Sequence, residues 1–275
     1  MKHWTKTRLA LGLAAPLLAL STPANAGIGD LLVAPTRVVL DGRKGTEIIL
    51  NNIGEEPATY RVSVEFRRMT EEGGLEDVKE PNAAEKLAEE MVVYAPRRVT
   101  LAPHEPQAIR LRARVPQGVA DGEYRVHLLF RAIPPATPVV QASAETAPKG
   151  VSFQITPVYG VTIPVIVRLG NLSATAAISD VRLDSKDGKK AVSLELSRKG
   201  NRSTFGEVRV LKAGMKTPIA LQRTVAVYTE IDKRRVTIPI DDAVAGSIAG
   251  PVTVQYAETF DDGSKVIAET QAVLR

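Results

Sequence analysis

Apolar and polar residues alternate along most of the chain, in short runs separated by Gly, Pro, Asn and Asp. Residues 59–66 illustrate the pattern, because every second position from Tyr60 to Phe66 is apolar. A period of two is typical of a β-strand with one buried face. The pattern therefore predicts an all-β chain of sandwich domains, with further strands at residues 36–40, 47–52, 107–115, 123–133, 174–183, 191–196, 205–211, 234–240, 252–257 and 265–274.

The longest alternation covers residues 151–167, where the odd positions are all apolar except that two prolines interrupt the run. Pro157 and Pro164 lack a backbone N–H, which an edge strand accepts more easily than a central one. We therefore expect a long edge strand with an apolar row. An exposed edge of this kind recruits other strands unless it is protected.

Three segments depart from the strand rhythm. Residues 82–91 (NAAEKLAEEM) are rich in helix formers and predict a short helix. Residues 134–149 contain four prolines among Ala, Ser and Thr, the composition of a long loop. Residues 168–171 (RLGN) end the long strand and indicate a domain junction.

The first 26 residues have the order of a secretory signal. Lys2, Lys6 and Arg8 precede an apolar run from Leu9 to Leu20, and Ala24-Asn25-Ala26 supplies a cleavage site. Removal of residues 1–26 leaves a chain that we divide into an amino-terminal domain, 27–168, whose last strand is 151–168, and a carboxyl-terminal domain, 169–275. We expect an exported protein that does not insert into the membrane after cleavage.

Composition argues against several classes of function. The sequence has no Cys, so thiol catalysis and cysteine metal sites are excluded. The cleaved chain carries 33 Lys and Arg against 31 Asp and Glu, a formal charge of +2, so nucleic-acid binding is not expected. Only His104 and His127 remain, without metal-ligand spacing, and no nucleophile elbow or phosphate loop is present. We expect neither an enzyme nor a cofactor or metal.

Charge is concentrated in one strand. Arg110, Arg112 and Arg114 share a face of the strand predicted at 107–115. Such a row either binds an acidic partner or forms a solvated sheet face, and the second is the commoner case.

Four stretches of the sequence resemble the periplasmic pilus chaperones of the PapD-like family. They are residues 34–42 (APTRVVLDG), Asn51-Asn52 with Pro57 and Tyr60, residues 95–103 (APRRVTLAP) with 107–110, and residues 122–125 (GEYR) leading to 130–135 (FRAIPP). The likeness covers about residues 30–170 and is only general beyond them. It implies two immunoglobulin-like sandwiches set at an angle, with a client bound in and around the cleft between them.

The resemblance also implies site residues. Arg37, beside Thr36, falls on the family's basic residue that holds the terminal carboxylate of a subunit, for which an Arg fork is suited. The family's long edge strand completes the unfinished sandwich of a subunit by strand addition. The side chains expected to insert are Ile155, Tyr159, Val161 and Ile163. These odd-numbered residues equally suit the core of their own domain.

Two further positions follow from the same alignment. Pro164 stands where the family has its second cation, a Lys. Either Arg37 and backbone donors hold the carboxylate alone, or the client is of another kind. Arg168 falls on a family Arg that pairs with an acid of the second domain, for which Asp262 or Asp261 is the candidate.

The resemblance and the strand pattern favour a periplasmic chaperone. It would cap pilus- or fimbria-type subunits and deliver them to an outer-membrane usher. Two alternatives come from other classes. A secreted adhesive or structural protein of two sandwiches needs no client, and an exported enzyme or carbohydrate-binding module needs an aromatic pocket, for which five Phe and six Tyr leave little material.

Overall fold

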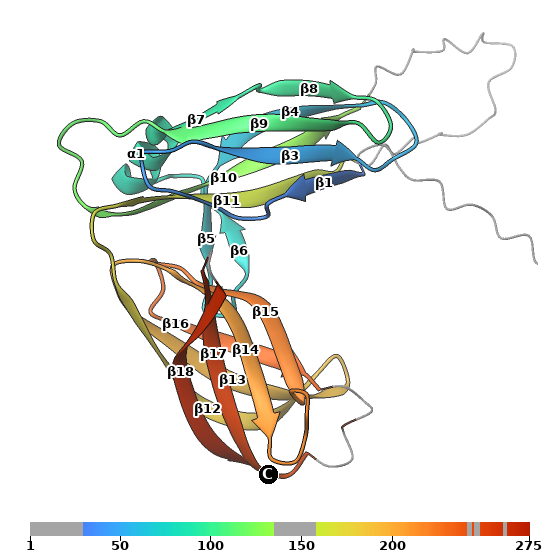
Figure 1. Ribbon diagram of the computed structural model, residues 1–275, viewed down its shortest axis with the longest axis vertical. Coiled ribbons are helices and arrows are strands. Elements are labelled where there is room, and N and C mark those ends of the chain that lie inside the picture. The colour runs from blue at the N-terminus through green and yellow to red at the C-terminus, as the bar shows by residue number, and fades with distance from the viewer. Residues whose placement is uncertain (1–29, 135–157, 241–243, 245–247, 261–262) are drawn as a thin grey trace, which may run out of the picture.

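The computed structural model describes residues 30–134, 158–240, 244, 248–260 and 263–275, and the described chain forms two β-sandwiches (Figure 1). The predicted signal and most of the predicted 134–149 loop lie outside these residues. The first sandwich lies across the top of the second, so that the two are set at an angle. This is the predicted all-β, two-sandwich fold.

The first sandwich consists of two sheets, named here after their strands β9 and β10. The β9 sheet has the order β1 (Leu31–Ala34), β3 (Thr46–Asn52), β9 (Pro106–Ala113) and β7 (Val92–Ala95). The β10 sheet has the order β2 (Val38–Leu40), β11 (Gly160–Leu169), β10 (Gly122–Ile133), β4 (Ala58–Glu65) and β8 (Arg98–Leu101).

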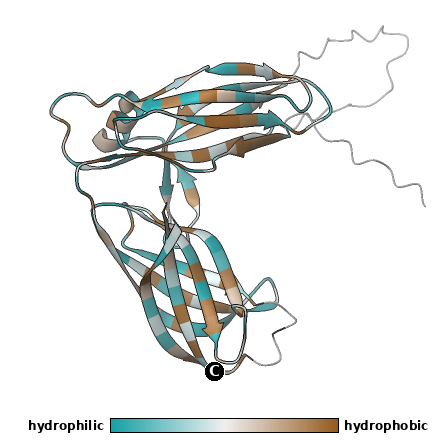
Figure 2. Cartoon of the chain, in the orientation of Figure 1, coloured by the Kyte–Doolittle hydropathy of each residue, from teal (hydrophilic) through white to brown (hydrophobic). Residues whose placement is uncertain are grey.

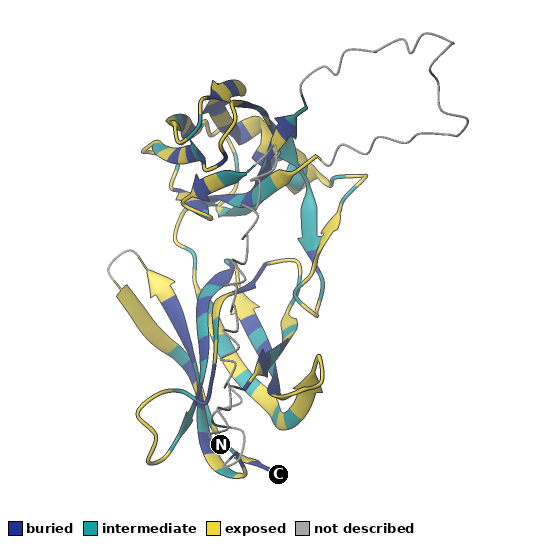
Figure 3. Ribbon diagram, turned by 90° about the vertical axis from the view of Figure 1, so that its right-hand side faces the viewer, coloured by how far each residue is buried: buried dark blue, intermediate teal, exposed yellow. Residues whose placement is uncertain are grey.

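The core of the first sandwich comes from the inward face of each alternating strand. Ile48 and Ile109 of the β9 sheet, and Leu128 and Phe130 of the β10 sheet, are fully buried in one cluster. Bands of hydrophobic and hydrophilic residues alternate along these strands in Figure 2, and buried and exposed bands alternate in Figure 3. The period of two in the sequence thus becomes one buried face per sheet.

The predicted helix forms α1 (Ala83–Met91). Its start is determined by a capping box, in which the Asn82 side chain accepts from the Glu85 N–H at 2.9 Å and Glu85 accepts from the Asn82 N–H at 2.7 Å. Ala88 and Met91 join the core of the first sandwich, so α1 packs against the sandwich on one apolar side. Helix and strand then follow without a loop, since β7 begins at Val92.

The second sandwich also has two sheets and a core of its own. The β13 sheet has the order β12 (Ala174–Lys186), β13 (Lys189–Gly200) and β16 (Lys233–Pro239). The β14 sheet has the order β15 (Ala220–Val227), β14 (Thr204–Lys212), β17 (Gly250–Phe260) and β18 (Gly263–Leu274). Val192, Leu194, Val208 and Tyr256 are among the residues buried between them.

A separate hairpin, β5 (Arg67–Met69) and β6 (Leu75–Asp77), reaches from the first sandwich to the second (Figure 1). In its turn the Glu71 carbonyl accepts from the Arg235 N–H at 2.6 Å. Gly73 has φ +83°, and a Cβ there would meet the Arg234 guanidinium at 2.4 Å. The hairpin therefore contacts the second sandwich closely, at a point away from the chain connection between β11 and β12.

The position of β11 corrects part of the sequence prediction. Strand β11 begins at Gly160, and residues 151–157 lie outside the described part of the chain. It pairs antiparallel with β10 from Gly160 to Leu169, and Val165–Val167 also pair in parallel with β2. The expectation of an edge strand is therefore wrong for Val165–Val167, because β2 covers that end. Among the described residues, Gly160–Pro164 have a strand neighbour on one side only.

Candidate functional site

Arg37 lies where the chain changes sheets. Strand β1 belongs to the β9 sheet and β2 to the β10 sheet, so residues 35–37 cross the end of the sandwich that faces the second domain. Arg37 Nη2 approaches Ser203 Oγ at 3.4 Å, and its guanidinium lies 4.7 Å from the centre of the Phe205 ring. Thr36 beside it is exposed.

Burial lowers the pKa of the Arg37 guanidinium from its usual value, and the nearby Arg168 acts in the same direction. An arginine nevertheless stays protonated in a protein. The buried Arg37 Nε has no hydrogen-bond partner in the described structure. Arg37 is therefore a partly desolvated cation whose donors are incompletely used, a state that favours binding of an anion.

Ser203 of the second domain lies among three charged residues of the first. Its N–H donates to Glu123 Oε2 at 2.9 Å, and its carbonyl accepts from Arg168 Nη2 at 3.0 Å. Arg168 Nε in turn lies 3.0 Å from Glu123 Oε2. The side chain of Glu123 is 1% exposed, so this pair is largely removed from water. Arg168 does reach the second domain, as the resemblance implied, but through the Ser203 backbone.

The described acid that pairs with Arg168 is therefore Glu123 of its own domain. Asp262, the predicted partner, lies outside the described residues. Sequence reasoning missed both Glu123 and Ser203, because a lone Glu at a strand start and a Ser in a turn carry no distinctive pattern.

A second group of contacts joins the two domains. Glu230 accepts from Arg125 Nη1 at 3.0 Å and from the Met69 N–H at 2.7 Å. The Arg125 guanidinium also lies 3.7 Å from the centre of the Tyr228 ring. Around them Met69, Ile166 and Tyr228 belong to a small buried cluster with Ala226. Polar and apolar contacts together thus hold the domains in one arrangement.

Between the domains lies a cleft with a volume of about 750 Å³. Its charged lining consists of Arg37, Lys44 and Arg168, with Asp41 as the acid. Its apolar lining includes Val39 of the first domain and Phe205 and Phe260 of the second. A cleft with excess positive charge and apolar walls suits the carboxylate end of a peptide that carries apolar side chains.

The predicted row of inserted side chains divides into three parts. Ile155 lies outside the described residues. Tyr159 is 53% exposed, and Val161 packs partly buried against the core. Ile163 is 1% exposed and belongs to the core of its own domain, so it cannot be offered to another chain as predicted. The freely exposed apolar residues are Val158 and Tyr159, just before β11.

A second hollow of about 460 Å³ adjoins this exposed pair. Val158, Leu129 and Ile133 give it an apolar lining, and Arg61 and Arg131 give it charge. Gly160 makes this end of β11 narrow, since a Cβ there would meet Leu129 Cδ1 at 2.9 Å. The open side of β11 therefore continues into a partly apolar hollow at one end.

Pro164 lies at the other end of the open stretch. It stands opposite His127 of β10, and the pairing of β11 with β2 begins one residue later, at Val165. His127 is 1% exposed, and neither of its ring nitrogens has a hydrogen-bond partner in the described structure. Burial, and then the charges of Arg125 and Arg67, lower the pKa of His127 to about 3. The imidazole is therefore neutral at ordinary pH.

Two searches of the described residues returned nothing. No group of three or more His, Cys, Asp or Glu side chains could hold a metal ion there. No helix among them is long and apolar enough to cross a membrane.

Comparison with solved structures places this arrangement among known proteins. The chain is similar to fimbrial chaperones. The Pseudomonas aeruginosa CupB2 chaperone is 11% identical, with a TM-score of 0.48 over 89% of this chain and 100% of that one. The E. coli chaperone DraB is 16% identical, with a TM-score of 0.46 over 89% and 96%. The SafB chaperone complex with Salmonella enterica SafA pilin gives 15%, 0.45, 89% and 96%.

No model of a known protein family matches the chain, and no curated protein matches it. The two-sandwich fold follows from the strand pairing described above. The function proposed next rests on the residues of this chain.

Proposed function

We propose that this protein is an exported periplasmic chaperone that binds pilus-type subunits by adding β11 to their unfinished sheets. The observation that carries the proposal is the open side of β11 at Gly160–Pro164, beside the exposed Val158 and Tyr159. An unpaired strand edge supplies main-chain donors and acceptors, and exposed apolar side chains next to it supply fit.

The cleft supports the same proposal from a second direction. Arg37 lines the cleft and has an unused buried donor. A client strand that pairs with β11 and ends near Arg37 would have its main chain and its terminal carboxylate bound together. Two separate contacts on one strand set its register, because a slip of one residue would move both. Delivery to an outer-membrane usher stays a prediction.

The test is periplasmic expression of the tagged chain, with identification of the protein that co-purifies. We expect one small exported subunit in equal amount, lost with Tyr159→Asp and weakened by Arg37→Ala. The matched control is Val273→Asp, since Val273 is 56% exposed on β18 of the second domain. It introduces the same charge at an exposed apolar site that the proposal does not use.

Hydrogen exchange provides the direct readout of strand addition. With the subunit bound, backbone amides within Gly160–Ile163 that are unpaired in the free chain should become protected. Unchanged exchange there, or equal capture by the wild type and Tyr159→Asp, contradicts strand addition. A protein found in the outer-membrane or fibre fraction without any subunit would favour the adhesive or structural alternative.

A further inference from the structure

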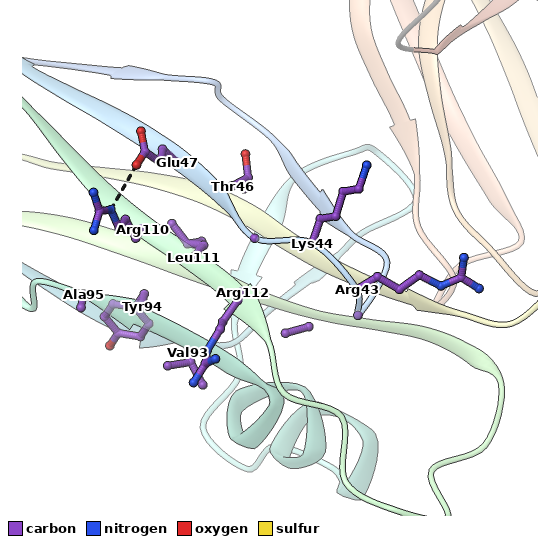
Figure 4. A pocket seen from close by; sticks show the side chains of 13 residues that line it. Arg43, Lys44, Thr46, Glu47, Val93, Tyr94, Ala95, Arg110, Leu111 and Arg112 are labelled. Carbon is purple, nitrogen blue, oxygen red and sulfur yellow. Dashed lines mark hydrogen bonds and ion pairs between the residues drawn. The ribbon is translucent and has the colours of Figure 1, made fainter.

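The loop Asp41–Gly45, between β2 and β3, separates two hollows. One is the interdomain cleft, which Asp41, Lys44 and Gly45 help to line. The other, of about 730 Å³, lies on the outer face of the β9 sheet and is lined by Arg43, Lys44 and residues of β3, β9 and β7 (Figure 4). Lys44 therefore borders both hollows, whereas Arg43 borders only the outer one.

The backbone of this loop is held in place. Asp41 Oδ1 accepts from the Arg43 N–H at 2.8 Å and from the Lys44 N–H at 3.1 Å. These bonds lower the pKa of Asp41, so its carboxylate stays charged. Gly42 has φ +76°, and a Cβ at Gly45 would meet the Leu111 carbonyl oxygen at 2.8 Å. The Lys44 side chain thus leaves from a well-defined point.

The charges of the cleft leave Lys44 and Arg37 available. Arg168 is paired with Glu123, and Asp41 accepts the two loop N–H groups. No ion pair is found for the Lys44 ammonium among the described residues. In Figure 4 the Lys44 and Arg112 side chains point in opposite directions, so Lys44 does not point toward the outer hollow's arginine on β9.

We propose that Lys44 is the second cation of the cleft, and that with Arg37 it holds the terminal carboxylate of a peptide. This inference rests on the proposed function and adds a residue to its site. A cation from the β2–β3 loop is required there because Pro164, at the corresponding level of β11, carries neither charge nor donor. Arg37 supplies a planar fork, and Lys44 a mobile point charge.

The walls of the cleft define the rest of the ligand. Phe205 and Phe260 come from the second domain, and Phe260 is 41% exposed. Val39, 46% exposed, comes from the first. An apolar side chain just before the carboxylate would bury this surface. The ligand is therefore a peptide carboxyl terminus that ends in an apolar or aromatic residue.

The experiment uses the full cleaved chain and two fluorescent peptides of about twelve residues that alternate Val and Thr, as strand addition requires. Both end in Phe, one as the free acid and one as the amide. Fluorescence anisotropy gives Kd for the wild type, Arg37→Ala, Lys44→Ala and Lys44→Arg. The matched control is Arg43→Ala, which removes the same charge one residue away, outside the cleft.

We expect Lys44→Ala to weaken binding of the acid about tenfold, the size of one charge-assisted contact. Binding of the amide should not change, and Lys44→Arg and Arg43→Ala should stay close to the wild type. An unchanged Kd for Lys44→Ala, or an equal loss for Arg43→Ala, overturns the role of Lys44. The proposed function stands in that case if Arg37→Ala still weakens binding of the acid. Failure of the wild type to bind either peptide overturns both.

Discussion

Replacement of His127 by Gln should remove a large part of the acid sensitivity of the first domain. His127 is buried on the face of the β10 sheet opposite its core partners, and its pKa is lowered to about 3, first by burial and then by Arg125 and Arg67. In the unfolded chain the same imidazole titrates near its ordinary value of about 6.5. Unfolding therefore takes up a proton at any pH between these two values.

The sign and size of the effect follow from this difference. The folded pKa is depressed, so the stabilisation is fully present above about pH 6.5 and is lost as the pH falls toward 3. At pH 5.0 the unfolded state gains roughly 2 kcal/mol from protonation of this one group. Down to pH 3 the loss reaches roughly 5 kcal/mol, an upper bound for a domain of ordinary stability.

The assay is urea unfolding followed by circular dichroism at pH 7.5 and pH 5.0, with each protein compared with itself. The wild type should lose roughly 2 kcal/mol more than His127→Gln between the two conditions. His127→Leu is the second variant, should the amide not fold. His104→Gln is the control, because the side chain of His104 is 64% exposed. Parallel losses in the wild type and in both His127 variants would refute the reasoning.

Three further predictions concern stability and the domain junction. Leu128→Ala, at a fully buried site in the first core, should lower the free energy of unfolding by about 2–5 kcal/mol in denaturant titration; a loss below that of an exposed Leu→Ala would contradict its burial. Asn82→Ala breaks the capping box of α1 and should cost about 1 kcal/mol, with Asn82→Ser retaining most of it. Glu230→Ala leaves Arg125 and the Met69 N–H without their acceptor, so calorimetry should resolve two domain transitions further apart than in the wild type. Coincident transitions in that variant would mean that Glu230 does not couple the domains.

The strand pattern predicted most of the first sandwich because its information is local. Residues 107–115 and 123–133 became β9 and β10 with ends shifted by one or two residues, and residues 82–91 became α1. The hairpin β5–β6 was missed, since Arg67–Met69 and Leu75–Asp77 are too short and polar to alternate. Strand β15 was missed in the same way, because Arg223 and Thr224 interrupt its apolar residues.

The candidate site could be predicted only in part, because its geometry depends on contacts between distant segments. The alternation at 151–167 is real in sequence, but it does not say where β2 ends the open edge, nor that Ile163 points into its own core. Arg37 was indicated by its motif. Ser203, Glu123 and Lys44 meet it only through the packing of the second domain and the β2–β3 loop, and no periodicity marks them.

The β5–β6 hairpin restricts how the two domains can move. A body joined at one point can turn about any axis through that point, but a body joined at two can turn only about the line between them. The covalent link between β11 and β12 is one such point, and the bond from the Arg235 N–H to the Glu71 carbonyl marks the other. Any opening of the cleft is then a single swing, so one distance between labels on Val39 and Phe260 would record it completely.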